Sequence, residues 1–351
     1  MNNVIKVEGK IIGEGQPTFL VAEIGSNHGL DKSIVKNMVD VSAKAGFDAV
    51  KFQIYAAEEV FSKHEMTTDV KLDYLYGVRP WWEVARDIIL MPRSWFGEMF
   101  DYVRSKGMIP FSAIHRVEDV EFLDQFGLPI IKIASIDLHY HHFLSQVAKY
   151  KKPMLISTGM AYLSEIDETM RLLKEENCKD IILLHCISQY PPIPSEVNLR
   201  NITMLREAFD APVGFSDHST GITTSIGAVA LNANVIEKHI TLDKTTKGPD
   251  HSFAIEPDEM YALVKAVREI EAAMGKSYRV LSERDLAARK MIRRSIVARD
   301  HIKKGDPITF KKIKFARPGS GIGTNEFKYI EGRRAARDIA AETIIEWNMI
   351  S

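Results

Sequence analysis

The sequence predicts a (β/α)8 barrel, the TIM-barrel fold, followed by a small C-terminal domain rich in β structure. Eight short apolar segments alternate with amphipathic segments of helical periodicity up to residue 274, which is the pattern of a barrel of parallel strands. A doubly wound open sheet is the alternative. No Gly-x-Gly-x-x-Gly turn follows the first apolar segment, and this disfavours the open sheet.

The expected elements follow in a regular order, beginning with a hairpin over residues 4–13. Apolar runs predict barrel strands at 19–24, 49–54, 108–112, 130–134, 154–157, 181–186, 213–216 and 234–239. Apolar residues at helical spacing predict helices at 33–45, 93–106, 117–125, 141–150, 163–176, 201–209, 220–231 and 257–274. We therefore divide the chain into a barrel domain (1–278), a linker (279–294) and a small domain (295–351).

One insertion interrupts the alternation between residues 56 and 91. It is rich in tyrosine, tryptophan and charge, and a loop of this length after a strand is usually functional or disordered. Because it follows the second predicted strand, we expect it over the C-terminal mouth of the barrel, as a lid or as a wall of the substrate site.

The composition excludes several classes of function. A chain of 351 residues with a formal net charge of -1 has no general attraction for nucleic acid or an anionic membrane. No apolar run approaches the ~20 residues of a membrane span, and the N-terminus has no signal-peptide pattern. Two cysteines provide no disulfide framework. These features favour a cytosolic protein with neither nucleic-acid nor membrane partners.

Two histidines follow neighbouring predicted strands near the end of the barrel. His218 comes just after the strand at 213–216, and His239 ends the strand at 234–239. One helix separates these strands, so they are expected to lie side by side and parallel. Two neutral imidazoles placed in this way can hold a divalent cation with positions open for water and substrate. The alternative is two structural histidines, each satisfied by a local hydrogen bond.

Polar residues stand at or just after the ends of the other predicted strands. They are Glu23, Lys51, Gln53, Ser112, Lys132, Ser135, Ser157, Thr158, His185, Ser188, Ser216 and Glu237. Burying Lys51 or Lys132 without a counter-charge would cost several kcal/mol, which indicates an anionic ligand. The alternative is a structural salt bridge to Glu23 or Glu237. Lysines and serines together suit a phosphate group. The sequence has no Walker loop, so a nucleoside triphosphate is not implied.

The residues alone therefore predict a barrel enzyme that joins a phosphorylated anion to a metal-activated electrophile, with Glu23 available for proton transfer.

Eight motifs resemble those of the sialic acid synthase family, which includes N-acetylneuraminate, legionaminate, pseudaminate and spore-coat polysaccharide synthases. They occupy residues 22–28 (AEIGSNH), 50–53 (VKFQ), 132–135 (KIAS), 157–160 (STGM), 185–191 (HCISQYP), 214–218 (GFSDH), 237–239 (EKH) and 248–251 (GPDH). Residues 316–321 (ARPGSG) resemble the family's antifreeze-like (SAF) domain. The resemblance covers essentially the whole chain.

The resemblance implies condensation of phosphoenolpyruvate with an N-acetylated aldose, such as N-acetylmannosamine, in its open-chain form. It implies a divalent metal, Mn²⁺ or Mg²⁺, on His218 and His239, and a proton-handling role for Glu23. The phosphoenolpyruvate ligands would be Lys51, Ser112, Lys132, Ser135, Ser157 and Ser216. The sugar ligands would be Gln53, Asp137, Tyr190, Asp250 and Arg317. Arg317 would come from the second subunit, which implies a domain-swapped homodimer.

Two departures from the family pattern concern the substrate site. Ser112-Ala113 stands where many relatives have Ser-Thr, so one hydroxyl is missing. Asp137 stands where many have glutamate, and its side chain is one methylene shorter. The other hypotheses are a metal-dependent barrel aldolase or hydrolase and a glycan-binding protein without activity. Whether His28 and His185 join the site or support it by hydrogen bonds also stays open, with structural support favoured.

Overall fold

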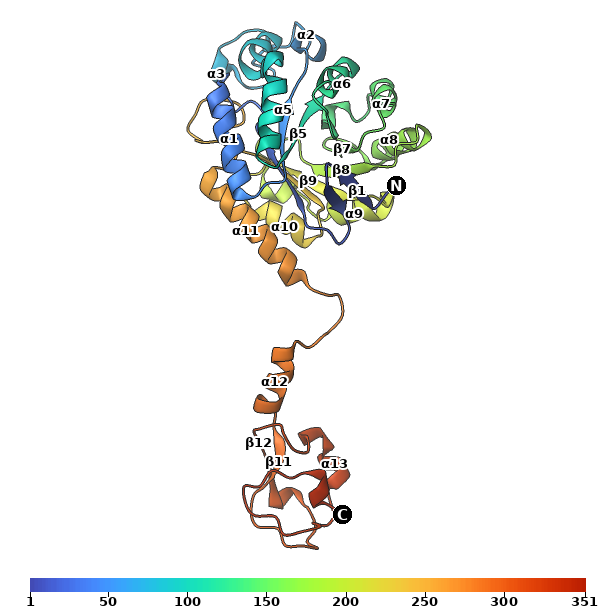
Figure 1. The fold of residues 1–351 in the computed structure, drawn as a ribbon, viewed down its shortest axis with the longest axis vertical. Helices are drawn as coiled ribbons and strands as arrows, with labels where there is room; N and C mark the ends of the chain where they lie inside the picture. Colours follow the sequence, from blue (N-terminus) through green and yellow to red (C-terminus); the bar gives the residue numbers. More distant parts are fainter. The chain divides into compact units, whose positions relative to one another are not determined.

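A computed structural model describes residues 1–351 and divides them into two compact units, Met1–Gly275 and Lys276–Ser351. The first unit is a closed barrel of eight strands in the order β10-β3-β4-β5-β6-β7-β8-β9, with every neighbouring pair parallel. Helices surround this barrel (Figure 1). The predicted (β/α)8 barrel is therefore confirmed, whereas the linker boundaries at 279 and 294 stay a prediction.

The barrel strands are short and almost wholly buried. They are β3 (Phe19–Glu23), β4 (Ala49–Gln53), β5 (Ile109–Ile114), β6 (Ile131–Ile133), β7 (Met154–Ser157), β8 (Ile181–Cys186), β9 (Val213–Asp217) and β10 (Val235–His239). Side chains fill the barrel interior and helices cover its outside, so both faces of each strand favour apolar residues. This explains why the strands are continuous apolar runs in the sequence.

Helices connect the strands in the expected order. They are α1 (Lys32–Ala45), α5 (Phe96–Ser105), α6 (Val117–Asp124), α7 (His141–Ala148), α8 (Leu163–Glu175), α9 (Asn201–Phe209), α10 (Thr223–Ala230) and α11 (Pro257–Met274). Local sequence sets the ends of α1. Asp31 caps its N-terminus by accepting a hydrogen bond from Ser33 N at 2.7 Å, and Gly46 ends it with a φ of 97°.

The alternation of side chains along β4 decides which residues face the barrel interior. Phe52 packs outward against Phe96 and Phe100 of α5, with ring centroids 6.1 Å apart in both pairs. Its neighbours Lys51 and Gln53 therefore point the opposite way, into the barrel.

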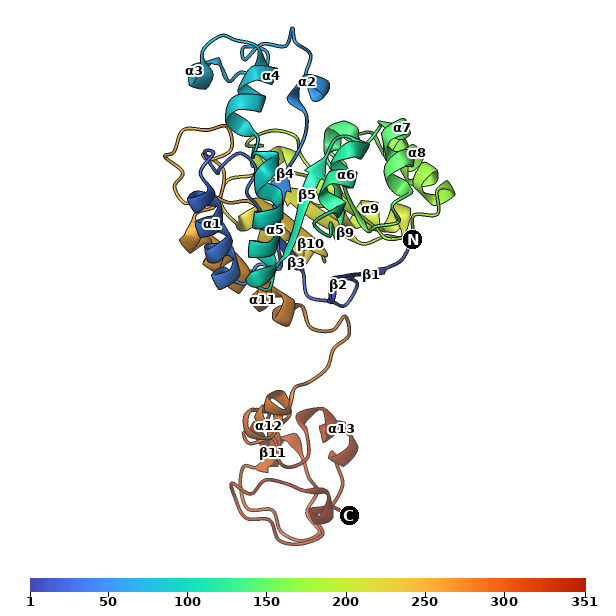
Figure 2. The ribbon, with the colours of Figure 1, turned by 45° about the horizontal axis from the view of Figure 1, so that its top comes forward.

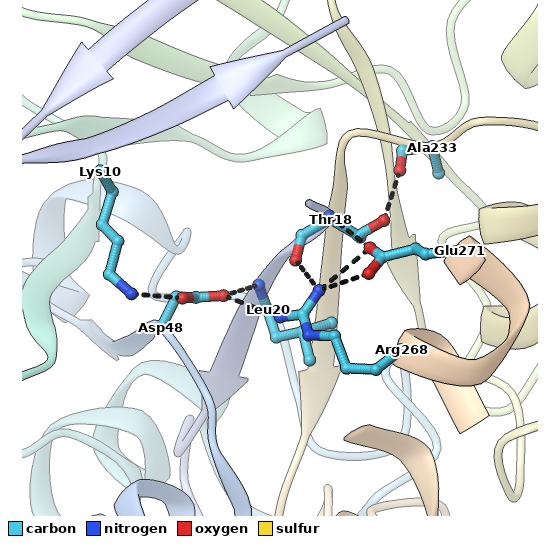
Figure 3. Close-up of polar contacts among 7 residues, drawn as sticks. All are labelled: Lys10, Thr18, Leu20, Asp48, Ala233, Arg268 and Glu271. Carbon is cyan, nitrogen blue, oxygen red and sulfur yellow. Dashed lines mark hydrogen bonds and ion pairs between the residues drawn. The ribbon is translucent and has the colours of Figure 1, made fainter. Parts of the chain in front are cut away.

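The N-terminal ends of the strands are held by a polar network (Figure 3). Asp48 accepts a hydrogen bond from Leu20 N at 2.9 Å and pairs with Lys10 of β2 at 2.8 Å. Thr18 N donates to Glu271 of α11 at 2.5 Å. These contacts join the hairpin of β1 (Val4–Val7) and β2 (Lys10–Gly13) and the last barrel helix to the start of β3. They lie at the end of the barrel that supports stability rather than chemistry.

The insertion folds into short helices with a small core of its own. It contains α2 (Ala57–Val60), α3 (Asp73–Tyr76), α4 (Trp81–Val84) and a π-helix (Ala85–Ile89), and a 3₁₀ turn (Arg93–Trp95) leads into α5. Trp81, Val84 and Ile89 form the buried core. Figure 2 shows α2, α3 and α4 grouped beyond one end of the barrel.

The second unit has a separate core made largely of isoleucine. It contains α12 (Glu283–Ile292), β11 (Ser295–Ala298), β12 (Ile313–Ala316) and α13 (Phe327–Ile330), with 3₁₀ turns at Phe310–Lys312, Thr324–Glu326 and Trp347–Met349. Strands β11 and β12 are antiparallel, and Ile296, Ile302 and Ile345 belong to the core. In neither unit is any helix both long and apolar enough to span a bilayer.

Candidate active site

A cavity of about 360 Å³ opens at the C-terminal ends of the barrel strands. Strand and loop residues from around the barrel line it, namely Lys51, Gln53, Tyr55, Val60, Phe61, Ala113, His115, Lys132, Ala134, Ser135, Ile136, Ser157, Met160, Cys186, Ser188, Tyr190, Ser216, His218, Glu237 and His239. Val60 and Phe61 belong to the insertion, which therefore contributes a wall of the cavity. This end of a barrel is where catalytic residues gather in enzymes of this fold.

Lys51 lies between two buried carboxylates. Its Nζ is 2.7 Å from Glu23 Oε2 and 3.5 Å from Glu237 Oε1, and Gln53 Nε2 donates to Glu23 Oε1 at 3.1 Å. Burial raises the pKa of Glu23 to about 7 against the opposing effect of Lys51. The salt-bridge alternative therefore holds for Lys51, and Glu23 is a carboxyl group able to exchange a proton near neutral pH.

Lys132 has different surroundings although it is equally buried. Its Nζ donates to Ser157 Oγ at 2.7 Å and to the Ile133 carbonyl at 3.1 Å, with no carboxylate in ion-pair contact. Burial lowers the pKa of Lys132 despite the more distant charge of Glu237. A buried lysine without a paired carboxylate is suited to bind an anionic ligand, because the ligand would supply the missing counter-charge.

Three serines surround this end of the cavity. Ser157 accepts the Lys132 bond, Ser135 Oγ accepts a hydrogen bond from Gly159 N at 3.0 Å, and Ser216 Oγ donates to Glu237 Oε1 at 2.9 Å. Gly159 allows close packing here, because a Cβ at that position would lie 2.3 Å from Ser188 Oγ. The hydroxyls and Lys132 together form a set of donors suited to a phosphate or carboxylate group.

His218 and His239 lie side by side, as the sequence predicts, with ring centroids 5.3 Å apart. His218 Nδ1 donates to the Ile187 carbonyl at 3.0 Å, so Nε2 is the ring nitrogen left for a ligand. Burial alone would lower the pKa of His218, but Cys186 and the Ile187 carbonyl outweigh burial and raise it above its usual value. His239 Nδ1 is buried without a hydrogen-bond partner. Burial, reinforced by His218, lowers the pKa of His239 well below its usual range, so that ring stays neutral.

These two imidazoles fit a divalent cation as part of an open coordination shell. Histidine binds metal through an unprotonated ring nitrogen, which the neutral His239 ring provides; a cation bound at His218 would displace its Nε2 proton. No group of three or more His, Cys, Asp or Glu side chains is arranged around one position. Substrate and water would therefore supply the remaining ligands.

Two of the predicted sugar ligands lie beside the histidines. The Tyr190 ring centroid is 4.2 Å from that of His218. Asp250 Oδ2 accepts a hydrogen bond from Ser26 Oγ at 2.7 Å and lies 3.9 Å from His239 Nδ1. Asp250 is not among the residues that line the cavity, although it borders the same histidine.

Asp137 is also near the cavity, but another residue covers it. His115 Nδ1 is 2.7 Å from Asp137 Oδ2, and His115, rather than Asp137, lines the cavity. The sequence interpretation missed His115 and Tyr55. Their positions in the sequence could have identified them, because His115 comes just after β5 and Tyr55 comes just after β4. The sequence favours Cys186 as buried filler rather than a nucleophile; it is buried, and it lines the cavity with its Sγ 3.9 Å from His218 Nδ1.

Several candidates do not reach the cavity. Ser112 is fully buried and donates to the Ala113 carbonyl at 2.9 Å. It stands opposite the outward-facing Phe52 in the β4–β5 register, so Ala113 takes the inward position. His185 Nε2 donates to the Val197 carbonyl at 2.6 Å, outside the cavity lining. Neither His28 nor Glu23 lines the cavity directly, and Arg317 belongs to the second unit.

Comparison with known proteins identifies the family of this chain. The sequence matches the model of the NeuB family over residues 38–279 and that of the SAF domain over residues 293–351. The chain belongs to the NeuB family. An uncharacterized protein of Methanocaldococcus jannaschii is 39% identical over 98% of each chain. The pseudaminic acid synthase of Campylobacter jejuni is 34% identical over 92% of this chain and 93% of its own.

A solved member has the same fold. The N-acetylneuraminic acid (sialic acid) synthetase of Leptospira borgpetersenii, determined in complex with citrate, is 31% identical. It superposes with a TM-score of 0.73 over 82% of this chain and 95% of its own. The NeuB match and the SAF match together confirm the family and the two types of domain that the sequence predicts.

Proposed function

We propose that this NeuB-family protein condenses phosphoenolpyruvate with the open-chain aldehyde of an N-acetylated amino sugar. The products would be a nonulosonic, sialic-type acid and inorganic phosphate. The observation that carries the proposal is Lys132, a buried cation without a paired carboxylate, beside serine hydroxyls in the same cavity as two adjacent histidines. This cavity combines a place for a phosphorylated anion with a place for a carbonyl group.

The protein would bind phosphoenolpyruvate through Lys132, Ser135, Ser157 and Ser216, with Lys51 between its two carboxylates at the same site. In the reaction, carbon 3 of phosphoenolpyruvate bonds to the aldehyde carbon, and the aldehyde oxygen takes a proton. Water adds to carbon 2, and the bond from carbon 2 to the phosphate oxygen breaks to release phosphate.

Glu23, one hydrogen bond behind Lys51 and Gln53 of the cavity lining, would take up the proton that the attacking water releases, because its pKa of about 7 lets the carboxylate gain and lose a proton near neutrality. Lys51, at 2.7 Å, holds Glu23 in place. His218 and His239 would hold a divalent ion, Mn²⁺ or Mg²⁺. Such an ion supplies Lewis-acid polarisation of a carbonyl oxygen.

The sugar would lie toward Gln53, Tyr190 and Asp250, and Arg317 of the partner subunit would contact its N-acyl group. This part of the proposal includes a domain-swapped homodimer, which light scattering of the purified protein checks. Because phosphoenolpyruvate is made and consumed inside the cell, we place the reaction in the cytosol. The acceptor is N-acetylmannosamine or a related N-acylated sugar of the legionaminate, pseudaminate or spore-coat polysaccharide pathways.

The test is phosphate release from phosphoenolpyruvate in the presence of N-acetylmannosamine and Mn²⁺, repeated with excess chelator. The acceptor is then replaced by 2,4-diacetamido-trideoxy sugars, and each product is identified by mass spectrometry. Lys132→Met should abolish release, whereas the exposed Lys265→Met serves as a matched control and should not. No release with any N-acylated aldose would overturn the proposal. Phosphate release that persists in excess chelator would support the condensation but show that it needs no metal ion.

A further inference from the structure

His115 and Asp137 form a nearly buried pair at the edge of the cavity. The Nδ1–Oδ2 distance is 2.7 Å, and about a tenth of each side chain is exposed (9% and 10%). His115 follows β5, and Asp137 ends the 3₁₀ turn Ser135–Asp137 that follows β6. A short contact between two side chains that are almost out of water fixes the orientation of the imidazole ring.

Aromatic packing fixes the same ring from another side. Tyr55 meets His115 edge to face, with centroids 5.3 Å apart and an angle of 89°. Tyr55 in turn packs on Phe61 of the insertion at 5.6 Å. Tyr55, Phe61 and His115 all line the cavity. The ring is therefore held by a carboxylate at Nδ1 and by an aromatic neighbour.

This arrangement determines which polar atom a ligand can meet. Asp137 uses its carboxylate on Nδ1 and does not line the cavity, so Nε2 is the polar atom of the pair that remains for a ligand. The neighbouring side chains Tyr55 and Phe61 add aromatic surface to this part of the cavity lining. Aromatic surface beside one polar ring atom suits the C–H and hydroxyl groups of a sugar better than the charged oxygens of phosphoenolpyruvate.

We propose that His115, oriented by Asp137, binds the acceptor sugar through a hydrogen bond between Nε2 and one of its hydroxyl or amide groups, and that this contact selects among acceptors. The inference rests on the proposed function. Asp137 is a positioning residue in this arrangement and His115 is the residue that touches the sugar. An aldose without a hydroxyl or amide group at the matching carbon would bind more weakly, because Nε2 would lose water without gaining a partner.

The test measures KM for the acceptor, KM for phosphoenolpyruvate and kcat in variants of the full-length protein. His115→Ala should raise KM for the acceptor about tenfold, the effect of one lost hydrogen bond, and leave KM for phosphoenolpyruvate within about twofold. Asp137→Ala should act in the same direction. His142→Ala, on the exposed side of α7, is the matched control and should change nothing. Melting temperatures verify folding, and His115→Gln replaces the alanine variant if that variant does not fold.

Two further measurements separate contact from support. Lengthening the carboxylate in the double variant His115→Ala/Asp137→Glu should recover part of the acceptor affinity, because the longer side chain can reach into the vacated space. Deoxy analogues of the acceptor should each be compared in wild type and His115→Ala. The hydroxyl that contacts His115 is the one whose removal costs wild type about tenfold and the variant nothing.

The outcomes separate this inference from the function on which it rests. If wild type releases phosphate and His115→Ala keeps the wild-type acceptor KM, the inference is overturned and the function stands. Equal losses for both substrates would assign the pair a purely structural role, which also overturns it. If wild type releases no phosphate with any N-acylated aldose, the proposed function fails, and the inference fails with it.

Discussion

Lys132 and Lys51 are both buried in the cavity, yet their surroundings predict opposite effects of the same substitution on stability. Lys132 donates to Ser157 Oγ and the Ile133 carbonyl, and burial lowers its pKa. Lys51 lies between Glu23 and Glu237. Burial alone would lower its pKa, but the two carboxylates outweigh burial and raise it. Without ligand, Lys132→Met should therefore stabilise the protein and Lys51→Met should destabilise it.

The magnitudes follow from the contacts that each lysine loses. Lys132→Met removes two hydrogen bonds, about 1 kcal/mol each, but also the desolvation cost of a buried ion, which is several kcal/mol. The balance is a gain on the order of 1 kcal/mol, or a rise in Tm of about 2 °C. Lys51→Met leaves Glu23 and Glu237 without their shared cation, which costs about 3–5 kcal/mol. The corresponding fall in Tm is about 6–10 °C.

The assay is thermal unfolding of metal-free protein, without and with phosphoenolpyruvate. At a concentration of 100 Kd, phosphoenolpyruvate should stabilise wild type by about 2.7 kcal/mol. It should not stabilise Lys132→Met at that same concentration, and both lysine variants should release no phosphate. A Lys132→Met protein that is less stable than wild type, or that phosphoenolpyruvate stabilises to the same extent, would refute the assignment of Lys132 as the unpaired cation of an anion site.

Three other predictions concern histidines and a third buried lysine, Lys238. His218→Ala and His239→Ala should each weaken Mn²⁺ binding in titration calorimetry, and unchanged affinity would exclude them as ligands. Burial lowers the pKa of His28 to about 4, so the unfolded chain binds the extra proton first as pH falls. The contribution of neutral His28 to the free energy of unfolding should be full above pH 6.5 and fall by about 3 kcal/mol between pH 6.5 and 4. His28→Gln should reduce this fall, as measured by chemical unfolding at each pH. Lys238 pairs with Asp217 at 3.0 Å with neither side chain exposed, so Lys238→Met should cost about 3–5 kcal/mol in unfolding measurements.

If the free energy of unfolding falls equally steeply below pH 6.5 in wild type and His28→Gln, other groups cause the loss of stability. A Lys238→Met protein as stable as wild type would show that Ser219, Thr224 and Ser225, which hydrogen-bond Asp217, satisfy that carboxylate without a cation.

The cavity lining was predictable where a polar residue interrupts or ends an apolar strand. Lys51, Lys132, Ser157 and His239 were recognised because a polar side chain is out of place in an apolar run, and barrel geometry brings strand ends together. Ser112 shows the limit of this inference. The sequence places it near the end of a strand, but register with β4 turns it outward and puts Ala113 in the cavity.

The alternation of apolar strands and amphipathic helices by itself determined the barrel, because hydrophobic burial on both faces of parallel strands leaves few other ways to fold such a pattern. It also determined which strand ends carry the polar residues. Only the tertiary structure decided how those residues pair. It gave Lys51 two carboxylates and Lys132 none, and it joined His115 to Asp137. These contacts depend on distances between strands far apart in the sequence, and local sequence does not encode such distances.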